Sequence, residues 1–128
     1  MDEKSSGMPG TDPKHVLIVD DDPELCEALT RALADGAGRF LVSTAANAQD
    51  ARWLAAHEQF DAAIVDVTLP GELGTSLAEH LAGLGIPCVL MSGDLREKTP
   101  SRRRFRLVNK PFRLETLRAA LRELLEEP

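Results

Sequence analysis

Short apolar runs alternate with amphipathic segments along most of this chain. The runs lack the alternation of apolar and polar residues typical of a half-exposed strand, so they suit strands that are buried on both faces of a parallel sheet. They cover residues 16–19, 40–42, 62–65 and 88–91, with a weaker run at 107–108. The pattern therefore predicts five buried strands.

The segments between these runs carry leucines and alanines at the spacing of one helix face. One helix is expected after Asp22 and Pro23, an N-cap residue followed by a proline in the first turn, and it should end near Gly36. Three more helices are expected within 48–55, 77–84 and 114–125. Residues 93–104 are polar and interrupted by proline, so the fourth helix, between the last two strands, is expected to be short or absent.

This alternation of strands and helices predicts the fold class. Strand-to-helix-to-strand units need right-handed crossovers, which give an α/β fold with a doubly wound five-stranded parallel sheet and helices on both faces. The length of 128 residues suits one compact domain. We expect that domain at 15–128, behind a disordered tail at 1–14 that is rich in Gly, Pro, Ser and charge.

Charge and composition exclude several classes of protein. The formal charge of −6 argues against general binding to nucleic acid or anionic lipid. No apolar run is long enough to cross a membrane. The chain has no apolar leader, and its two cysteines fall within predicted core elements, so the expected location is the cytoplasm.

Polar side chains follow directly after the predicted strands. Ligands of doubly wound sheets bind outside the carboxyl ends of the strands, where the strand order reverses. The residues at those ends are Asp20, Asp21 and Asp22 after the first strand, Asp66 after the third, Ser92 after the fourth and Lys110 after the fifth. If the strand order is the flavodoxin-like 2-1-3-4-5, the first and third strands are neighbours, and the aspartate run lies beside Asp66.

Several carboxylates in one small space raise one another's pKa unless a cation lies among them. Their hard oxygen atoms suit Mg²⁺, which usually takes phosphate oxygens as further ligands. Lys110 adds a positive charge and Ser92 a hydroxyl donor, so Asp66 is placed to attack phosphorus and form an acyl phosphate. These residues predict Mg²⁺-dependent phosphoryl chemistry.

Four motifs in order, each ending a predicted strand, carry a family resemblance. VLIVDDDPEL, AIVDVTLPGELG, VLMSGD and VNKPF resemble the receiver domain of two-component response regulators, over essentially all of residues 15–127. The resemblance implies that Asp66 is the phosphoacceptor. It also implies that Asp20, Asp21, Asp66 and the backbone carbonyl of Thr68 hold Mg²⁺.

The same resemblance implies that the Ser92 hydroxyl contacts a phosphoryl oxygen and that Lys110 pairs with it. The implied phosphodonor is a histidine kinase or a histidine phosphotransfer protein, and a homodimer through the last helix is left open. No direct binding to nucleic acid or membrane is expected. Leu107 stands where many receivers carry Tyr or Phe, and the connection from Ser92 to Lys110 is shorter than usual, so the output is expected to pass through 93–104.

Two other functions start from the same residues. A Mg²⁺-dependent phosphatase would use Asp66 as a transient nucleophile, but enzymes of the haloacid dehalogenase type carry a second aspartate two residues later, where this chain has Thr68. A phosphorylation-independent, receiver-like binding module is the other alternative, and the complete set of acidic and basic residues argues against it. We therefore expect a signalling phosphoacceptor that catalyses only its own phosphorylation and slow dephosphorylation.

Some residues have no predicted role in this chemistry. The three histidines share no spacing and are expected at the solvent or the core edge. Trp53 breaks the apolar stripe of its helix, which predicts partial exposure. Gly71 and Gly74 are expected in turns.

Overall fold

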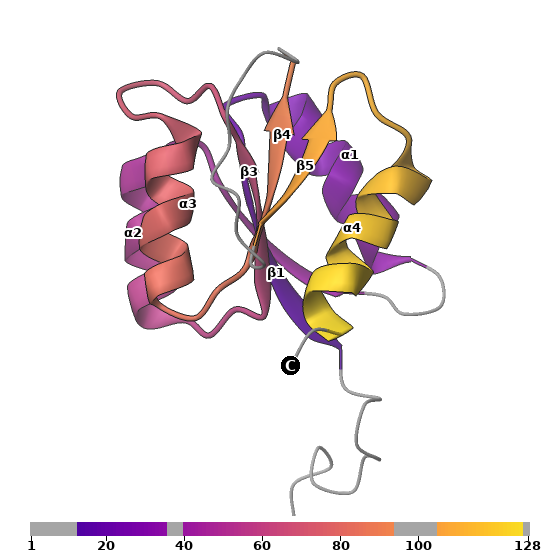
Figure 1. Cartoon of the computed structure of the whole chain (residues 1–128), viewed down its shortest axis with the longest axis horizontal. Helices are drawn as coiled ribbons and strands as arrows, with labels where there is room; N and C mark the ends of the chain where they lie inside the picture. The colour runs from indigo at the N-terminus through magenta and orange to yellow at the C-terminus, as the bar shows by residue number, and fades with distance from the viewer. Residues whose placement is uncertain (1–12, 36–39, 94–104, 127–128) are drawn as a thin grey trace, which may run out of the picture.

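A computed structural model describes residues 13–35, 40–93 and 105–126 (Figure 1). The described part contains the elements β1 (Lys14–Val19), α1 (Pro23–Ala34), β2 (Phe40–Ala45), α2 (Ala48–His57), β3 (Ala62–Asp66), α3 (Gly74–Gly83), β4 (Cys88–Ser92), β5 (Phe105–Asn109) and α4 (Leu114–Glu126). Every strand and helix predicted from the hydrophobic pattern is present within these ranges.

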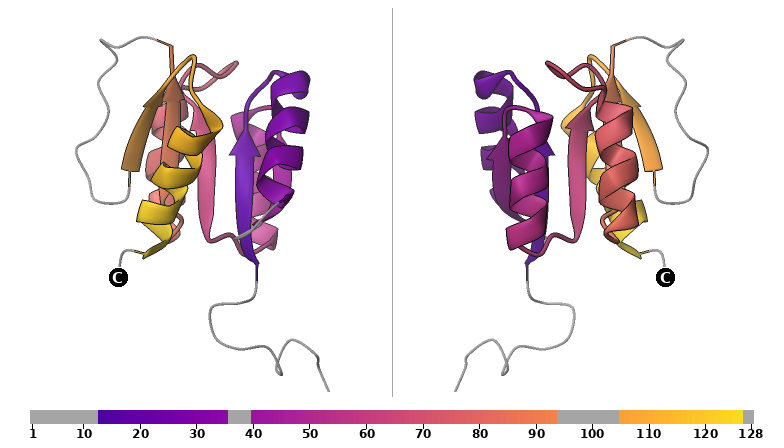
Figure 2. Two further views of the ribbon diagram at one scale, coloured as in Figure 1. Left: turned by 90° about the vertical axis from the view of Figure 1, so that its right-hand side faces the viewer. Right: turned by 90° about the vertical axis from the view of Figure 1, so that its left-hand side faces the viewer.

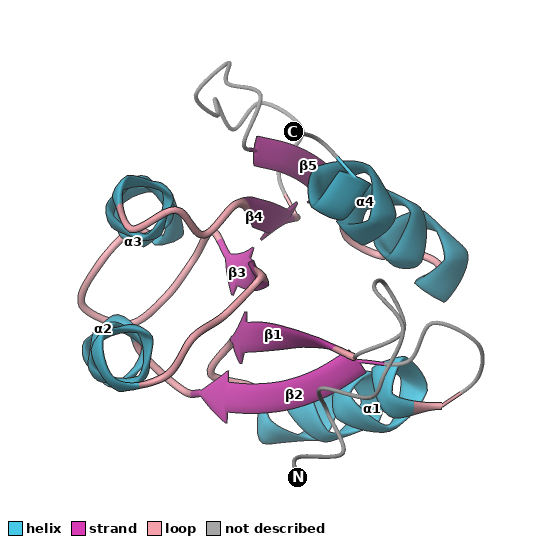
Figure 3. Ribbon diagram, turned by 90° about the horizontal axis from the view of Figure 1, so that it is seen from below, coloured by secondary structure: helices cyan, strands magenta, loops and turns pink. Residues whose placement is uncertain are grey.

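The five strands form one sheet in the order β2-β1-β3-β4-β5, and every neighbouring pair is parallel. This confirms the doubly wound α/β fold and its 2-1-3-4-5 strand order. Helices α2 and α3 cover one face of the sheet, and α1 and α4 cover the other (Figure 3). The two views in Figure 2 show one helix pair in front of the sheet at a time.

The core consists of two apolar layers, one on each face of the sheet. Successive residues of the central strands point to opposite faces, so Leu17 packs toward α2 and α3 while Ile18 packs toward α1 and α4. Both side chains are fully buried. This explains why the strand runs are apolar without alternation, since both faces of the sheet are covered.

Helix α1 begins at Pro23, directly after the predicted N-cap residue Asp22, and ends at Ala34. The sequence predicts its end near Gly36, two residues further on. The Asp22 side chain accepts hydrogen bonds from the backbone N–H groups of Glu24 and Leu25, which caps the helix. At the other end, the Arg118 guanidinium of α4 donates to the carbonyls of Ala32 and Asp35. The last helix therefore supplies the polar partners that the end of the first helix needs.

Some expectations fall on residues outside the described ranges. The disordered tail predicted for 1–14 mostly lies there, and the first described strand begins at Lys14. The short or absent helix predicted within 93–104 also lies there, except for Gly93. Both stay predictions. Among the described residues, no helix has the length and apolar composition needed to cross a membrane.

Two glycines lie in the loop between β3 and α3 and at the first position of α3. Gly71 has a positive φ of 80°, as a turn glycine often does. Gly74 is instead the first residue of α3, where a Cβ would lie 2.7 Å from the Cα of Val67 and closer still to the carbonyl oxygen of Asp66. The expectation that Gly74 is a turn residue was wrong, because this glycine lets α3 begin directly against the end of β3.

Gly74→Ala should therefore lower the free energy of unfolding by about 1–3 kcal/mol, since the added methyl group meets backbone rather than a side chain that can move. Gly83→Ala is the matched control at the other end of α3, where a Cβ meets nothing within 4 Å. That variant should be neutral or gain up to about 0.5 kcal/mol from helix propensity. Urea unfolding measures both changes, and equal effects of the two substitutions would contradict the close approach.

Candidate functional site

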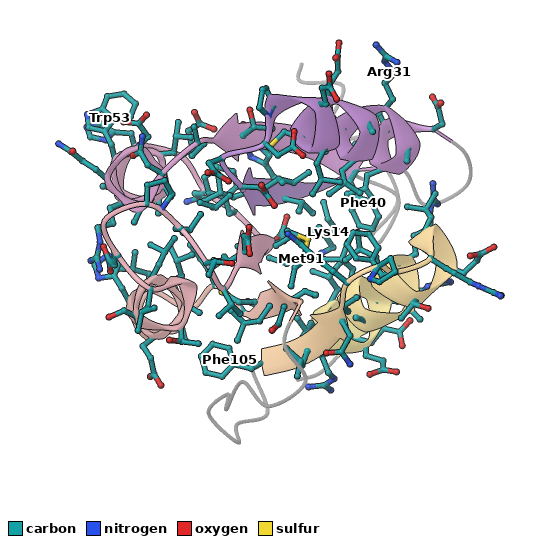
Figure 4. The ribbon with its side chains drawn as sticks, turned by 90° about the horizontal axis from the view of Figure 1, so that it is seen from above. Lys14, Arg31, Phe40, Trp53, Met91 and Phe105 are labelled. Atoms are coloured by element: carbon teal, nitrogen blue, oxygen red, sulfur yellow. The ribbon has the colours of Figure 1, made fainter. Side chains whose placement is uncertain are left out.

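The predicted site residues meet at the carboxyl edge of the sheet, the edge that faces the viewer in Figure 4. Asp20 directly follows β1, Asp66 ends β3, and Ser92 ends β4. Lys110 directly follows β5. Parallel strands carry their carboxyl ends to the same edge, and the pairing of β1 with β3 places the aspartate run beside Asp66.

Three carboxylates lie close together at this edge. One oxygen atom from each of Asp20, Asp21 and Asp66 lies within 4.8 Å of the other two. Asp20 and Asp66 are 2% and 5% exposed, while Asp21 is exposed to solvent. The cluster is therefore a half-enclosed acidic site with one side open.

Lys110 provides the positive charge in this cluster. Its Nζ lies 3.3 Å from Oδ2 of Asp66 and 3.6 Å from Oδ2 of Asp20. Burial alone would lower the pKa of Lys110, but the two carboxylates outweigh it and raise the pKa above its usual value. Lys110 is consequently a fixed positive charge at neutral pH.

Asp66 is oriented by both of its oxygen atoms. Oδ1 accepts hydrogen bonds from the backbone N–H and the side-chain hydroxyl of Thr68, at 3.1 and 3.2 Å. Oδ2 accepts from Lys110. The carboxylate plane is thus fixed between a loop on one side and the end of β5 on the other.

Asp20 has one satisfied and one unsatisfied oxygen atom. Oδ1 accepts from the backbone N–H of Asp22 at 2.9 Å. Oδ2 is buried and has no hydrogen-bond partner among the described residues, with only the ion pair to Lys110 nearby. Burial raises the pKa of Asp20, and the neighbouring carboxylates of Asp66 and Asp21 raise it further.

These residues fit a small, hard cation. A buried carboxylate oxygen without a hydrogen bond is costly unless another group binds it. Three carboxylates that lie beside one another offer the oxygen ligands that Mg²⁺ prefers. Asp20, Asp21 and Asp66 could thus hold the ion that the sequence predicts.

Ser92 is buried at the end of β4 and 1% exposed. Its backbone carbonyl accepts from the N–H of Lys110 at 2.7 Å, which ties together the ends of β4 and β5. The contact of its hydroxyl with a phosphoryl oxygen, and the role of the Thr68 carbonyl as a metal ligand, stay predictions. Leu107 lies on β5 and is 38% exposed.

The residues without a predicted role lie away from this edge. His15 lies at the core edge, with its ring tilted against that of Phe60 and a 3.0 Å contact between Nδ1 and the Gln59 carbonyl. Trp53 is 59% exposed and stacks on His57, which confirms the predicted exposure. These side chains take no part in the acidic site.

One contact near the site was missed by sequence analysis. Arg52 of α2 donates to Glu72 at 2.5 Å, and this ion pair joins α2 to the loop that carries Thr68. Twenty positions separate the two residues. No local pattern in the sequence signals such a pair.

The parallel 2-1-3-4-5 sheet and the acidic site with its lysine define a receiver domain. A family model of the response regulator receiver domain matches residues 16–122. The chain therefore belongs to the response regulator receiver domain family, and it is a receiver domain of two-component signal transduction.

The chain is also similar to individual known proteins. A curated relative is Protein PetR of Rhodobacter capsulatus, 35% identical over 94 residues, which are 71% of this chain and 39% of that protein. The receiver domain protein (CheY-like) of Methanospirillum hungatei JF-1 matches with a TM-score of 0.75 and 24% identity, over 90% of this chain and 95% of that chain. The chemotaxis response regulator CheY4 of Vibrio cholerae matches with a TM-score of 0.73 and 26% identity, over 89% and 100%.

The raised pKa of Asp20 predicts how stability depends on pH. Because the folded pKa lies above the unfolded one, ionisation of Asp20 favours unfolding, and its cost grows as pH rises through the folded pKa. In metal-free buffer, Asp20→Asn should unfold at higher temperature than the wild type at pH 7, and the gain should shrink as pH falls toward 3. Glu115→Gln, an exposed change on α4, is the control without such a gain. A gain that stays constant with pH would contradict this account.

Proposed function

We propose that this receiver domain accepts a phosphoryl group on Asp66 in a Mg²⁺-dependent reaction, and so relays a two-component signal. The observation that carries the proposal is the position of Asp66, whose carboxylate lies between Lys110 and the acidic residues that follow β1. Membership of the receiver family supports the same role. The phosphodonor would be a histidine kinase or a histidine phosphotransfer protein.

The transfer needs little covalent machinery. An oxygen of Asp66 bonds to phosphorus, the bond from phosphorus to the donor histidine nitrogen breaks, and its electron pair returns to the imidazole. The protein contributes position and charge, which are the main sources of catalysis in phosphoryl transfer. Thr68 and Lys110 hold the Asp66 carboxylate in place, since each contacts one of its oxygen atoms.

The metal site belongs to the same proposal. Asp20, Asp21, Asp66 and the Thr68 carbonyl would hold Mg²⁺, which when bound supplies positive charge against the phosphoryl oxygens. Lys110 would then pair with a phosphoryl oxygen, and Ser92 would donate its hydroxyl to another. Asp20 is nearly fully buried, whereas Asp21 faces solvent, so Asp21 lies on the side where an ion enters.

A phosphatase that acts on separate substrates is a weaker proposal. The residue two positions after Asp66 is Thr68, and its hydroxyl donates to Asp66. A threonine hydroxyl cannot serve as the acid and base that a carboxylate would provide. We therefore propose that the chain is a signalling phosphoacceptor in the cytoplasm, which catalyses only its own phosphorylation and slow dephosphorylation. The chain spans 39% of the length of PetR.

Phosphorylation of Asp66 is tested directly by mass spectrometry after incubation with acetyl phosphate and Mg²⁺. The wild type should gain one phosphate, and Asp66→Asn should gain none because an amide is a poor nucleophile. Asp61→Asn is a control, since Asp61 lies at the opposite end of β3 and is exposed. Stoichiometric labelling of Asp66→Asn would overturn the assignment, and an unlabelled wild type would favour a phosphorylation-independent binding module.

Asp21→Ala tests the metal site separately. The variant should lose the Mg²⁺-dependent NMR shifts of the wild type, because one of the clustered oxygen ligands is gone. It should also raise thermal stability in metal-free buffer, since the removal of one of three crowded charges relieves repulsion. Asp50→Ala, at an exposed position of α2, is a control that keeps the Mg²⁺ response. An unchanged Mg²⁺ titration of Asp21→Ala would contradict the proposed site.

A further inference from the structure

A groove of about 420 Å³ lies between α1 and the end of β2 and adjoins the acidic cluster. Pro23 and Cys26 line it from α1, and Ala45 and Ala46 line it from the end of β2 and the residue after it. Its volume falls within the range of pockets that bind small molecules. The phosphoacceptor chemistry makes no use of most of this space.

The walls of the groove are mainly apolar. The Cys26 thiol donates to the carbonyl of Asp20, at 3.4 Å between sulfur and oxygen. Burial and the nearby carboxylate of Asp20 raise the pKa of this thiol, so it stays protonated and uncharged. Cys26 therefore contributes a small apolar surface to the groove. A flat apolar ring suits such a wall.

The polar groups of the groove are predominantly acidic. Asp20 and Asp21 of the acidic cluster line one end of the groove. Asp20 is 2% exposed, and its Oδ2 accepts no hydrogen bond from the described residues. Glu27 and Arg31 also line the groove, but they neutralise each other in an ion pair of 3.0 Å. Lys110 pairs with Asp20 at 3.6 Å, so the unpaired charge at the groove is the exposed carboxylate of Asp21. A single negative charge beside an apolar wall favours a cation and disfavours an anion.

We infer that this groove is a binding site for a small organic cation with a flat apolar body, such as an arylamidine. The charged end pairs with the exposed carboxylate of Asp21, and the body lies against Pro23 and Ala46. Amidinium groups match carboxylates well because they donate two parallel hydrogen bonds.

The site overlaps the proposed metal site through Asp21. A cation bound there takes the exposed carboxylate that Mg²⁺ would also use, so the two should compete. This competition rests on the proposed function, whereas binding of the organic cation to metal-free protein does not. The groove thus offers a way for a small molecule to suppress phosphorylation without contact to Lys110.

Benzamidine is a suitable probe, and benzamide is its uncharged counterpart of nearly the same shape. In an NMR titration of metal-free protein, benzamidine should give saturable amide shifts at Cys26, Thr30 and Ala46, which line the groove. Benzamide should bind at least roughly tenfold more weakly, because it lacks the charge-assisted hydrogen bonds. Equal binding of the two compounds, or no saturable shifts in the groove, would overturn the inference.

A variant that fills the groove gives the second test. Ala46→Phe, at an exposed position of the wall, should weaken benzamidine binding at least roughly tenfold while thermal unfolding shows that the fold is kept. Ala56→Phe, at an exposed position of α2 that is not part of the groove, should bind like the wild type. Equal benzamidine affinity of Ala46→Phe and the wild type would place the ligand elsewhere and refute the site.

Addition of Mg²⁺ separates this inference from the proposed function. Mg²⁺ should raise the apparent dissociation constant of benzamidine, and benzamidine should slow labelling of Asp66 by acetyl phosphate. Benzamidine binding in the groove that Mg²⁺ leaves unchanged would disprove the overlap at Asp21. If benzamidine binds as expected but Asp66 is never labelled, the proposed phosphoacceptor function is wrong and the inferred binding site for organic cations is still supported.

Discussion

The crowding of three carboxylates at the carboxyl edge of the sheet is the constraint on which the functional site depends. Asp20, Asp21 and Asp66 approach within 4.8 Å, and their mutual repulsion opposes the folded state. Lys110 offsets part of this repulsion, and backbone N–H groups of Asp22 and Thr68 offset another part. What is left is a net negative site with an unsatisfied buried oxygen, which a cation can stabilise.

The backbone holds these carboxylates in position. The backbone N–H of Asp20 donates to Ala45, that of Val67 to Met91 and that of Lys110 to Ser92. These hydrogen bonds join the end of β1 to β2, the end of β3 to β4 and the end of β5 to β4. Beyond β3, the close approach at Gly74 fixes where the following helix begins. Backbone hydrogen bonds thus fix the positions of the functional residues, and side-chain contacts orient their carboxylates. Such an arrangement costs little reorganisation when charge develops during a reaction.

The sequence predicted those features that follow from local pattern and from the chirality of the chain. The apolar runs and the Asp22 cap required only near neighbours, and the crossover rule then brought Asp20 and Asp66 to one edge. The contacts that were missed depend on three-dimensional distances. Arg52 and Glu72 meet across two elements, Gly74 looks like any turn glycine in the sequence, and the unsatisfied oxygen of Asp20 exists only once its surroundings are known.

The contact of Arg118 with the end of α1 bears on the order in which the chain is completed during synthesis. A ribosome releases β1, α1 and β2 long before residue 118, so the carbonyls of Ala32 and Asp35 lack this partner until the last helix emerges. The first βαβ unit therefore leaves the ribosome before Arg118 can donate hydrogen bonds to the end of α1. Arg118 thus joins the end of an early helix to a helix that is made more than 80 residues later, so this end of α1 is completed only after α4 has formed.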